Sequence, residues 1–150
     1  MSERPVGPAF LLAQIGAHAA RRFAERLEPL GLTPAHAGIL WNLSHHPGMT
    51  QRELAERLDA FPSRLVLLLD ELEAQGWVER LNDPNDRRTR TVNLTASGKK
   101  QLKRIGEVAR EHQLDLCAAL DDVERETLRT LLEKVALQQG LRSRVHPGFR

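Results

Sequence analysis

Apolar residues recur every three or four positions near the start of the chain, and this spacing predicts one long helix over about residues 7–29. A hydroxyl cap followed by proline, Thr33-Pro34, begins a second helix that ends near Ser44. The sequence Thr50-Gln51-Arg52-Glu53 has the spacing of a capping box and begins a short third helix. A fourth helix begins at Pro62, and four leucines form its apolar stripe: Leu65, Leu68, Leu69 and Leu72.

After the fourth helix, the spacing of apolar residues changes from helical to alternating. Gly76 stands where the C-terminal cap of a helix is expected. Two alternating runs, Trp77–Leu81 and Thr89–Leu94, flank a polar loop that contains a proline and two adjacent arginines. This pattern predicts a two-stranded hairpin with an arginine-bearing tip.

Two further helices are expected beyond the hairpin. Thr95 caps a fifth helix that continues to about Leu120. Asp121-Asp122-Val123-Glu124 has the spacing of another capping box and begins a last helix that continues to about Gln139. Long terminal helices outside a compact module usually form the scaffold of a dimer.

The order of these elements defines the fold class. A short helix, a second helix and an arginine-tipped hairpin form a winged helix-turn-helix, so the chain is expected to be mainly α with a small β-hairpin. We expect one domain over residues 1–150, in which about residues 34–98 form the part that binds DNA. The long helices at about residues 8–30 and 99–140 are expected to form the dimer scaffold.

Charge is segregated along the chain. The overall net charge is only +2, yet residues 77–106 hold eight basic and three acidic side chains, a net charge of +5. Residues 107–139 hold four basic and eight acidic side chains, a net charge of −4. One end of the molecule should therefore attract phosphate groups, although a basic surface that is merely solvated remains an alternative.

The composition and the motifs exclude several functional classes. The longest strongly apolar run, Leu65–Leu69, is too short to cross a membrane. A single cysteine, Cys117, fits a reducing compartment, so a cytoplasmic location is expected, and its apolar neighbours predict a buried structural thiol. The chain lacks a Gly-rich phosphate loop, a paired metal motif and a Ser-centred elbow, so neither an enzyme nor a cofactor or metal is expected.

The hairpin sequence resembles that of a known family. Asp83-Pro84-Asn85-Asp86-Arg87-Arg88, followed by Val92-Asn93-Leu94-Thr95 and Gly98, is similar to the wing signature of the MarR family of bacterial transcriptional regulators. Leu54-Ala55 and the segment from Leu68 to Gly76 also match the family pattern. The resemblance covers about residues 8–140, nearly the whole chain.

The resemblance implies a homodimer that binds a pseudo-palindromic operator in double-stranded DNA and represses transcription. Each subunit would place its fourth helix, the recognition helix, in a major groove and its wing in a flanking minor groove. Arg87 and Arg88 would be the wing-tip residues, and an arginine suits a narrow, strongly negative minor groove. We expect Asp86 to orient one neighbouring guanidinium by ion pairing; a turn-stabilising role is the alternative, and the two are compatible.

The recognition helix departs from the family pattern because it is acidic. From Pro62 to Gly76 it carries one basic and three acidic side chains. In one reading, Ser63 and Arg64 contact bases and Leu67 packs on a thymine methyl group. In the other, the helix no longer reads DNA and the chain is a winged-helix protein-interaction module. We favour the first reading because the wing retains its arginine tip.

Residues around the recognition helix complete the expected interface. Phe61 occupies a position where a polar cap is usual, and it is expected to pack between the wing and the third helix. DNA phosphates should be held by the start of the third helix and by arginines that flank the wing: Thr50, Gln51, Arg52, Arg80 and Arg90.

Many members of the family release DNA when a small aromatic or phenolic acid binds between the dimer scaffold and the reading helices. The resemblance therefore implies a ligand site on the first, second and fifth helices, for which we name His18, Arg22, Trp41 and His45. A basic side chain would hold the carboxylate and the tryptophan would cover the ring. In the alternative reading, Trp41 belongs to the core and the two histidines are ordinary, partly exposed residues.

Overall fold

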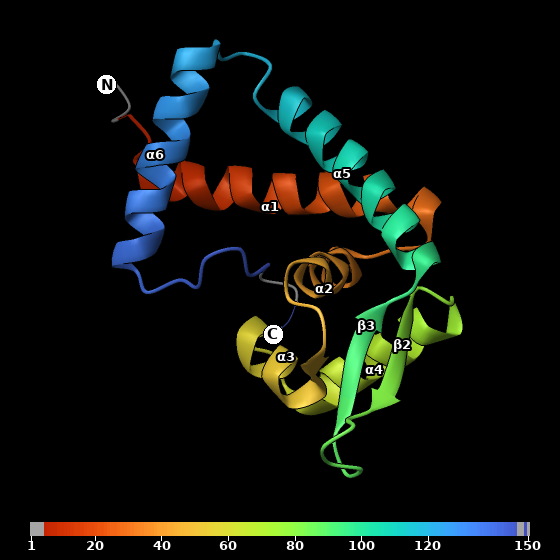
Figure 1. The fold of residues 1–150 in the computed structure, drawn as a ribbon. Helices are drawn as coiled ribbons and strands as arrows, with labels where there is room; N and C mark the ends of the chain where they lie inside the picture. The colour runs from red at the N-terminus through yellow and green to blue at the C-terminus, as the bar shows by residue number, and fades with distance from the viewer. Residues whose placement is uncertain (1–4, 147–148, 150) are drawn as a thin grey trace.

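The computed structural model describes residues 5–146 and 149, which form a mainly helical molecule with a small sheet at one edge (Figure 1). The helices are α1 (Pro8–Leu27), α2 (Pro34–His45), α3 (Gln51–Leu58), α4 (Pro62–Ala74), α5 (Ala96–Leu116) and α6 (Asp122–Gln138), with a 3-10 turn, η1 (Glu28–Leu30), between the first two. The strands are β1 (Met49–Thr50), β2 (Val78–Asn82) and β3 (Arg90–Leu94). This architecture confirms the predicted fold class.

Side chains at the helix starts explain why the helices begin where they do. Thr33 and Thr50 each accept a hydrogen bond from the backbone N–H three residues later, and that third residue's side chain accepts one in return from the cap's backbone N–H. Asp121 forms the same reciprocal box with Glu124 at the start of α6. Thr95 caps α5 by accepting from the backbone N–H of Gly98.

The sheet contains a short strand that the apolar pattern did not predict. Its order is β1-β3-β2, with antiparallel neighbours. Met49 pairs with Val92 and Thr50 with Thr91, so Thr50 both ends a strand and caps α3. Because this pairing fixes the start of α3 against the central strand of the wing, it sets the position of the helix-turn-helix relative to the hairpin.

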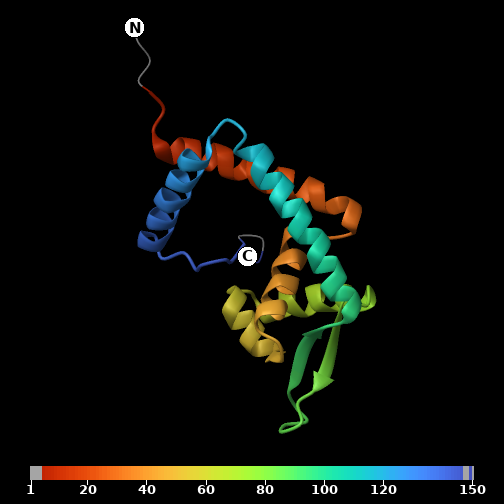
Figure 2. The ribbon, with the colours of Figure 1, turned by 45° about the horizontal axis from the view of Figure 1, so that its top comes forward.

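The core lies within the helix-turn-helix part of the molecule. All four leucines of the α4 stripe are buried, as predicted, and they pack with leucines of α2 and α3 and with Val92 of the central strand. The hairpin loop lies at the end of the molecule opposite α6 in both views (Figures 1 and 2). None of the described helices is long and apolar enough to cross a membrane.

Helix α5 ends at Leu116, four residues earlier than expected. The chain turns there: Ala118 donates to the carbonyl of Asp115 and Leu120 to that of Cys117, before the cap at Asp121 begins α6. Cys117 therefore lies at a helix end and is only partly buried, so the prediction of a buried thiol was wrong.

The segment after α6 returns to the reading part of the molecule (Figure 2). Gly140, with φ of +70°, follows the end of α6, and the chain then runs back toward α2 and α3. The Arg142 guanidinium donates to the backbone carbonyl of Glu56, and Arg144 lies 5.0 Å from the ring centroid of Trp41. Phe149 is fully buried in the core.

Candidate nucleic-acid interface

Two aspartates organise the tip of the wing. The Asp86 carboxylate accepts hydrogen bonds from the backbone N–H of Arg88 at 3.0 Å and from the hydroxyl of Thr89 at 3.1 Å. The Asp83 carboxylate accepts from the backbone N–H of Asn85 at 2.9 Å. These contacts fix the loop backbone, as Asx turns do.

The wing-tip arginines project from this ordered loop. Arg87 and Arg88 are both exposed. Asp86 forms no ion pair with either of them among the salt bridges of the described residues, so the turn-stabilising interpretation of Asp86 holds and the ion-pairing one was wrong. The arrangement presents two cationic side chains on a loop whose backbone is already ordered.

The exposed face of α4 begins with a mixture of polar and apolar side chains. Ser63 and Arg64 are exposed in its first turn. Leu67 is 61% exposed, and Phe61, the residue before the helix, is 67% exposed. The expected packing of Phe61 between the wing and α3 was therefore wrong.

The acidic groups of α4 are all engaged by neighbouring side chains. The Asp70 carboxylate lies 2.5 Å from Nη2 of Arg80, and the Glu73 carboxylate lies 2.5 Å from Nε of the same arginine. His36 of α2 accepts the Thr33 backbone N–H at Nδ1, so its Nε2 carries the proton that is donated to Glu71, at 2.6 Å. Arg80 therefore offsets one of the two net negative charges of the recognition helix, and neutral His36 hydrogen-bonds Glu71 without offsetting its charge.

Arg80 connects three elements of the reading part of the molecule. Its side chain is 14% exposed, and besides the two carboxylates on α4 it donates to Oε1 of Gln51 on α3 at 3.4 Å. Partial burial lowers the pKa of Arg80, but the hydrogen bonds to Asp70 and Glu73 outweigh this effect and the pKa is raised overall. Arg80 and Gln51, both predicted to hold phosphates, are hydrogen-bonded to each other, and Arg80 is also paired with α4.

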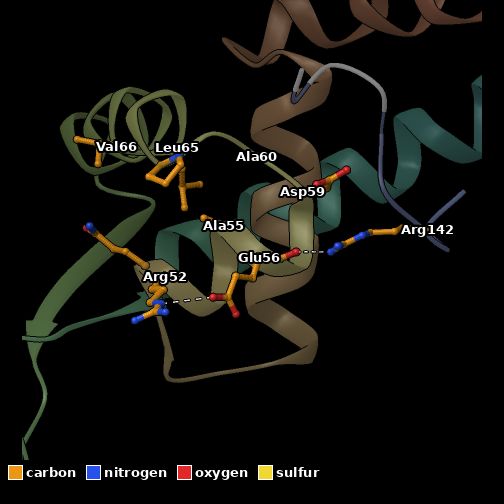
Figure 3. A pocket seen from close by; sticks show the side chains of 10 residues that line it. Arg52, Ala55, Glu56, Asp59, Ala60, Leu65, Val66 and Arg142 are labelled. Carbon is orange, nitrogen blue, oxygen red and sulfur yellow. Dashed lines mark hydrogen bonds and ion pairs between the residues drawn. The ribbon is translucent and has the colours of Figure 1, made fainter.

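The remaining expected phosphate contacts lie around the start of α3 and on the wing. Thr50 accepts the Glu53 backbone N–H at 3.1 Å. Arg52 pairs with Glu56 at 3.3 Å, but its side chain is 89% exposed, so water screens the pair and the guanidinium can exchange partners (Figure 3). Arg90 is exposed at the start of β3, opposite Asn82.

An open cavity of about 600 Å³ lies beside the start of α4 (Figure 3). Its wall is formed by α3, by Leu65 and Val66 of α4, and by Arg142 from the segment after α6. Arg52 and Arg142 lie on either side of Glu56. The cavity therefore adjoins the expected DNA-facing surface rather than the dimer scaffold.

A second open cavity, of about 550 Å³, lies between α1 and α5. It is lined by Gln14, Ile15, His18, Arg22, His112, Asp115 and Leu116. Nδ1 of His112 has no hydrogen-bond partner among the described residues, and its ring stacks on Phe23 with centroids 5.3 Å apart. Burial lowers the pKa of His112, and the nearby Arg26 lowers it further. His112 is a potential ligand contact that sequence reasoning missed.

The four residues expected to bind a ligand fall in two places. His18 and Arg22 line the cavity between α1 and α5. Trp41 and His45 are not among its lining residues; they stack on each other, with centroids 3.9 Å apart, and Arg144 lies against the Trp41 ring. Trp41 is only partly buried and is not a core residue. The four-residue spacing of Trp41 and His45 on α2 allows the stack, but no local pattern predicts which helix faces the cavity.

Comparisons with known proteins agree with this geometry. A profile of the MarR family matches residues 30–89. A candidate transcriptional regulator of the hcr operon in Thauera aromatica is 34% identical over 121 residues, which is 80% of this chain and 73% of that protein. The multiple antibiotic resistance protein MarR of Escherichia coli is 34% identical over 116 residues, which is 77% of this chain and 81% of that protein, so the chain belongs to the MarR family.

Solved structures of regulators on DNA have the same fold. A cysteine-to-serine variant of Escherichia coli MarR, in complex with operator DNA, is 31% identical, with a TM-score of 0.74 over 85% of this chain and 91% of that one. The transcriptional repressor CouR, bound to a 23-mer duplex, is 30% identical, with a TM-score of 0.79 over 90% of this chain and 99% of that one. Family membership confirms the prediction of a DNA-binding transcriptional regulator rather than an enzyme.

Proposed function

We propose that this protein is a transcriptional repressor that binds a pseudo-palindromic operator as a homodimer. The observation that carries the proposal is the wing, whose ordered loop presents Arg87 and Arg88 to solvent. In the bound state these side chains enter the minor groove, while the start of α4 enters the adjacent major groove. Arg52, Arg90 and the Thr50 hydroxyl contact phosphates.

Burial supports the dimer. Helix α6 has no buried residue in the single chain, even though it carries several apolar side chains. Among them Val123, Leu131 and Leu137 are 75%, 55% and 81% exposed. The first half of α1 is exposed in the same way, with Phe10 at 59%. Apolar helix faces of this extent are stable in water when a second copy covers them.

Charge placement supports DNA reading over a protein-interaction role. The acidic groups of α4 are paired with Arg80 and His36, so they oppose a nearby phosphate less than their number suggests. The protein-interaction alternative arose from the net charge of this helix. Because Arg80 offsets part of that charge and the wing presents two arginines to solvent, DNA binding is the favoured function.

Selection from a random duplex pool tests the proposal. The protein would be incubated with the pool at near-physiological salt, and the bound duplexes sequenced after several rounds. An enriched motif with two-fold symmetry is the expected result, because two recognition helices would read two half-sites. Salt-sensitive binding with no enriched motif would contradict sequence-specific recognition of DNA. A protein-interaction module would then be the better explanation of the fold.

The wing tip should contribute measurably to affinity. We expect Arg88→Ala to weaken binding to the selected duplex by at least about 1 kcal/mol, roughly fivefold, the low end for one good contact. Arg110→Ala, an equal loss of charge at an exposed position on α5, is the matched control and should change affinity little. Fluorescence anisotropy at fixed salt measures the DNA affinity of both variants. If the two substitutions weaken binding equally, the wing contributes only through the net charge of the protein.

We further propose that a small phenolic acid regulates DNA binding from the cavity between α1 and α5. His18, Arg22 and His112 line it. Among the described residues Arg22 forms an ion pair with Glu25 alone, and both side chains are more than 40% exposed. Such a guanidinium can transfer to a ligand carboxylate at little cost.

A panel of hydroxybenzoic acids tests this regulation. We expect at least one acid to release the selected duplex, while the corresponding uncharged phenol has a weaker effect because it lacks the carboxylate. Arg22→Ala should raise the concentration that is needed for release, and DNA affinity without ligand should stay unchanged. If no acid in a broad panel releases DNA or changes tryptophan fluorescence, ligand control through this cavity is contradicted.

A further inference from the structure

Three exposed apolar side chains lie at the start of the recognition helix. Phe61 is 67% exposed, Leu67 61% and Val66 39%. The buried stripe occupies the opposite side of α4, so these side chains do not contribute to the core. Exposed apolar groups cost free energy in water, and the N-terminal part of a recognition helix is the part that meets base edges.

The polar groups that could read bases from α4 are few. The Asp70 and Glu73 carboxylates are held by Arg80, and the Glu71 carboxylate is held by His36. Cytosine is read through its N4 amino donor, which needs an acceptor such as a carboxylate. The three carboxylates are held by Arg80 and His36 on the later turns of α4, so the start of its exposed face presents Ser63, Arg64 and the apolar side chains.

The chemistry of the major groove offers one apolar feature, the C5-methyl group of thymine. Guanine, adenine and cytosine present hydrogen-bonding atoms there, and placing a leucine or phenylalanine against those atoms removes their water without replacing it. A methyl group against the same side chain buries apolar surface on both sides. The apolar group therefore favours thymine over each other base at the positions that it touches.

We propose that this protein selects its operator largely by contact with thymine methyl groups, through Leu67 at the centre of the exposed face and Phe61 at the helix start. Val66, which lines the cavity beside α3, flanks Leu67. The inference rests on the proposed DNA-binding function and specifies how the bases are distinguished. It requires thymines at fixed positions in each half-site, under the first two turns of α4.

Replacing thymine with deoxyuridine, one position at a time in the selected duplex, tests the methyl contact alone. The substitution removes only the methyl group and leaves base pairing and the groove's hydrogen-bonding atoms intact. We expect about three- to fivefold weaker binding at each contacted position, as expected for losing one buried methyl group. Deoxyuridine outside the half-sites is the control, and 5-bromodeoxyuridine, whose bromine fills the methyl position, should restore affinity.

The Leu67→Ala variant assigns the contact to the protein. Because Leu67 is exposed, the variant should fold normally, bind the deoxyuridine duplex as well as the unchanged protein does, and no longer distinguish thymine from uracil. Phe61→Ala should remove the discrimination at a different position. If the variants discriminate as strongly as the parent protein, the methyl effect comes from DNA shape and the assignment is overturned.

The outcomes also separate this inference from the function on which it rests. Specific binding with equal affinity for thymine and uracil at every half-site position overturns methyl reading and leaves the proposed repressor function intact. Failure to enrich any duplex motif contradicts sequence-specific DNA binding itself.

Discussion

Arg80→Ala should weaken binding to the selected duplex by at least tenfold, the largest effect on DNA binding that we expect from one side chain. In the unchanged protein, Arg80 compensates Asp70 and Glu73 at 2.5 Å each. Its loss leaves two carboxylates uncompensated on the helix that enters a groove lined with phosphates, and like charges repel. Folding stability should fall less, by roughly 1–2 kcal/mol, because both carboxylates are about half exposed to water.

A triple variant distinguishes the two possible roles of Arg80. If repulsion by the freed carboxylates causes the loss, Arg80→Ala combined with Asp70→Asn and Glu73→Gln should recover most of the affinity. If Arg80 instead contacts a phosphate itself, the triple variant should remain as weak as Arg80→Ala. Anisotropy titrations at two salt concentrations, with circular dichroism to confirm folding, would separate these outcomes.

Gly98→Ala should cause the largest loss of folding stability, about 3 kcal/mol or more. Gly98 lies in the first turn of α5, and a Cβ atom there would stand 2.0 Å from the backbone carbonyl oxygen of Trp77. The same oxygen accepts the Thr95 N–H at 3.1 Å, and Thr95 Oγ1 donates to the carbonyl of Gly76. No side chain can rotate away to relieve the clash, so the junction of β2 and α5 must shift.

Gly106→Ala is the matched control within the same helix. Nothing lies within 4 Å of a Cβ atom at Gly106, which is exposed, so alanine should stabilise the helix by about 1 kcal/mol through its higher helix propensity. Thermal unfolding at one protein concentration would compare the two, since the midpoint of the proposed dimer would depend on concentration. A Gly98→Ala protein as stable as the parent would contradict the close approach of Trp77 to α5.

Local sequence patterns predicted much of the fold. The leucine spacing of α4 and the caps at Thr33, Thr50 and Asp121 depend on residues within one or two turns, so they could be read directly from the sequence. The early end of α5 could not, since several apolar residues continue the pattern past the turn at Cys117.

Contacts between distant residues escaped the sequence analysis. Strand β1 is only two residues long, and its pairing with β3 joins positions more than forty residues apart. The partners of Arg80 lie on α3 and α4, and no local pattern in the sequence indicates them. From the sequence alone, the position of Arg80 in the hairpin suggested a phosphate contact. Likewise, the spacing of Trp41 and His45 allows their stack, but the separation of this stack from the cavity at His18 depends on how the helices cross.

The connection of Gln51, Arg80 and α4 has a consequence for regulation. Because one guanidinium joins α3, α4 and β2, the recognition helix cannot easily tilt independently of its own wing. A molecule bound between α1 and α5 would therefore act on the distance between the two subunits' recognition helices rather than on either helix alone. Its effect on affinity would depend on operator spacer length, so a duplex with one base pair added or removed between its half-sites would be released at a different ligand concentration.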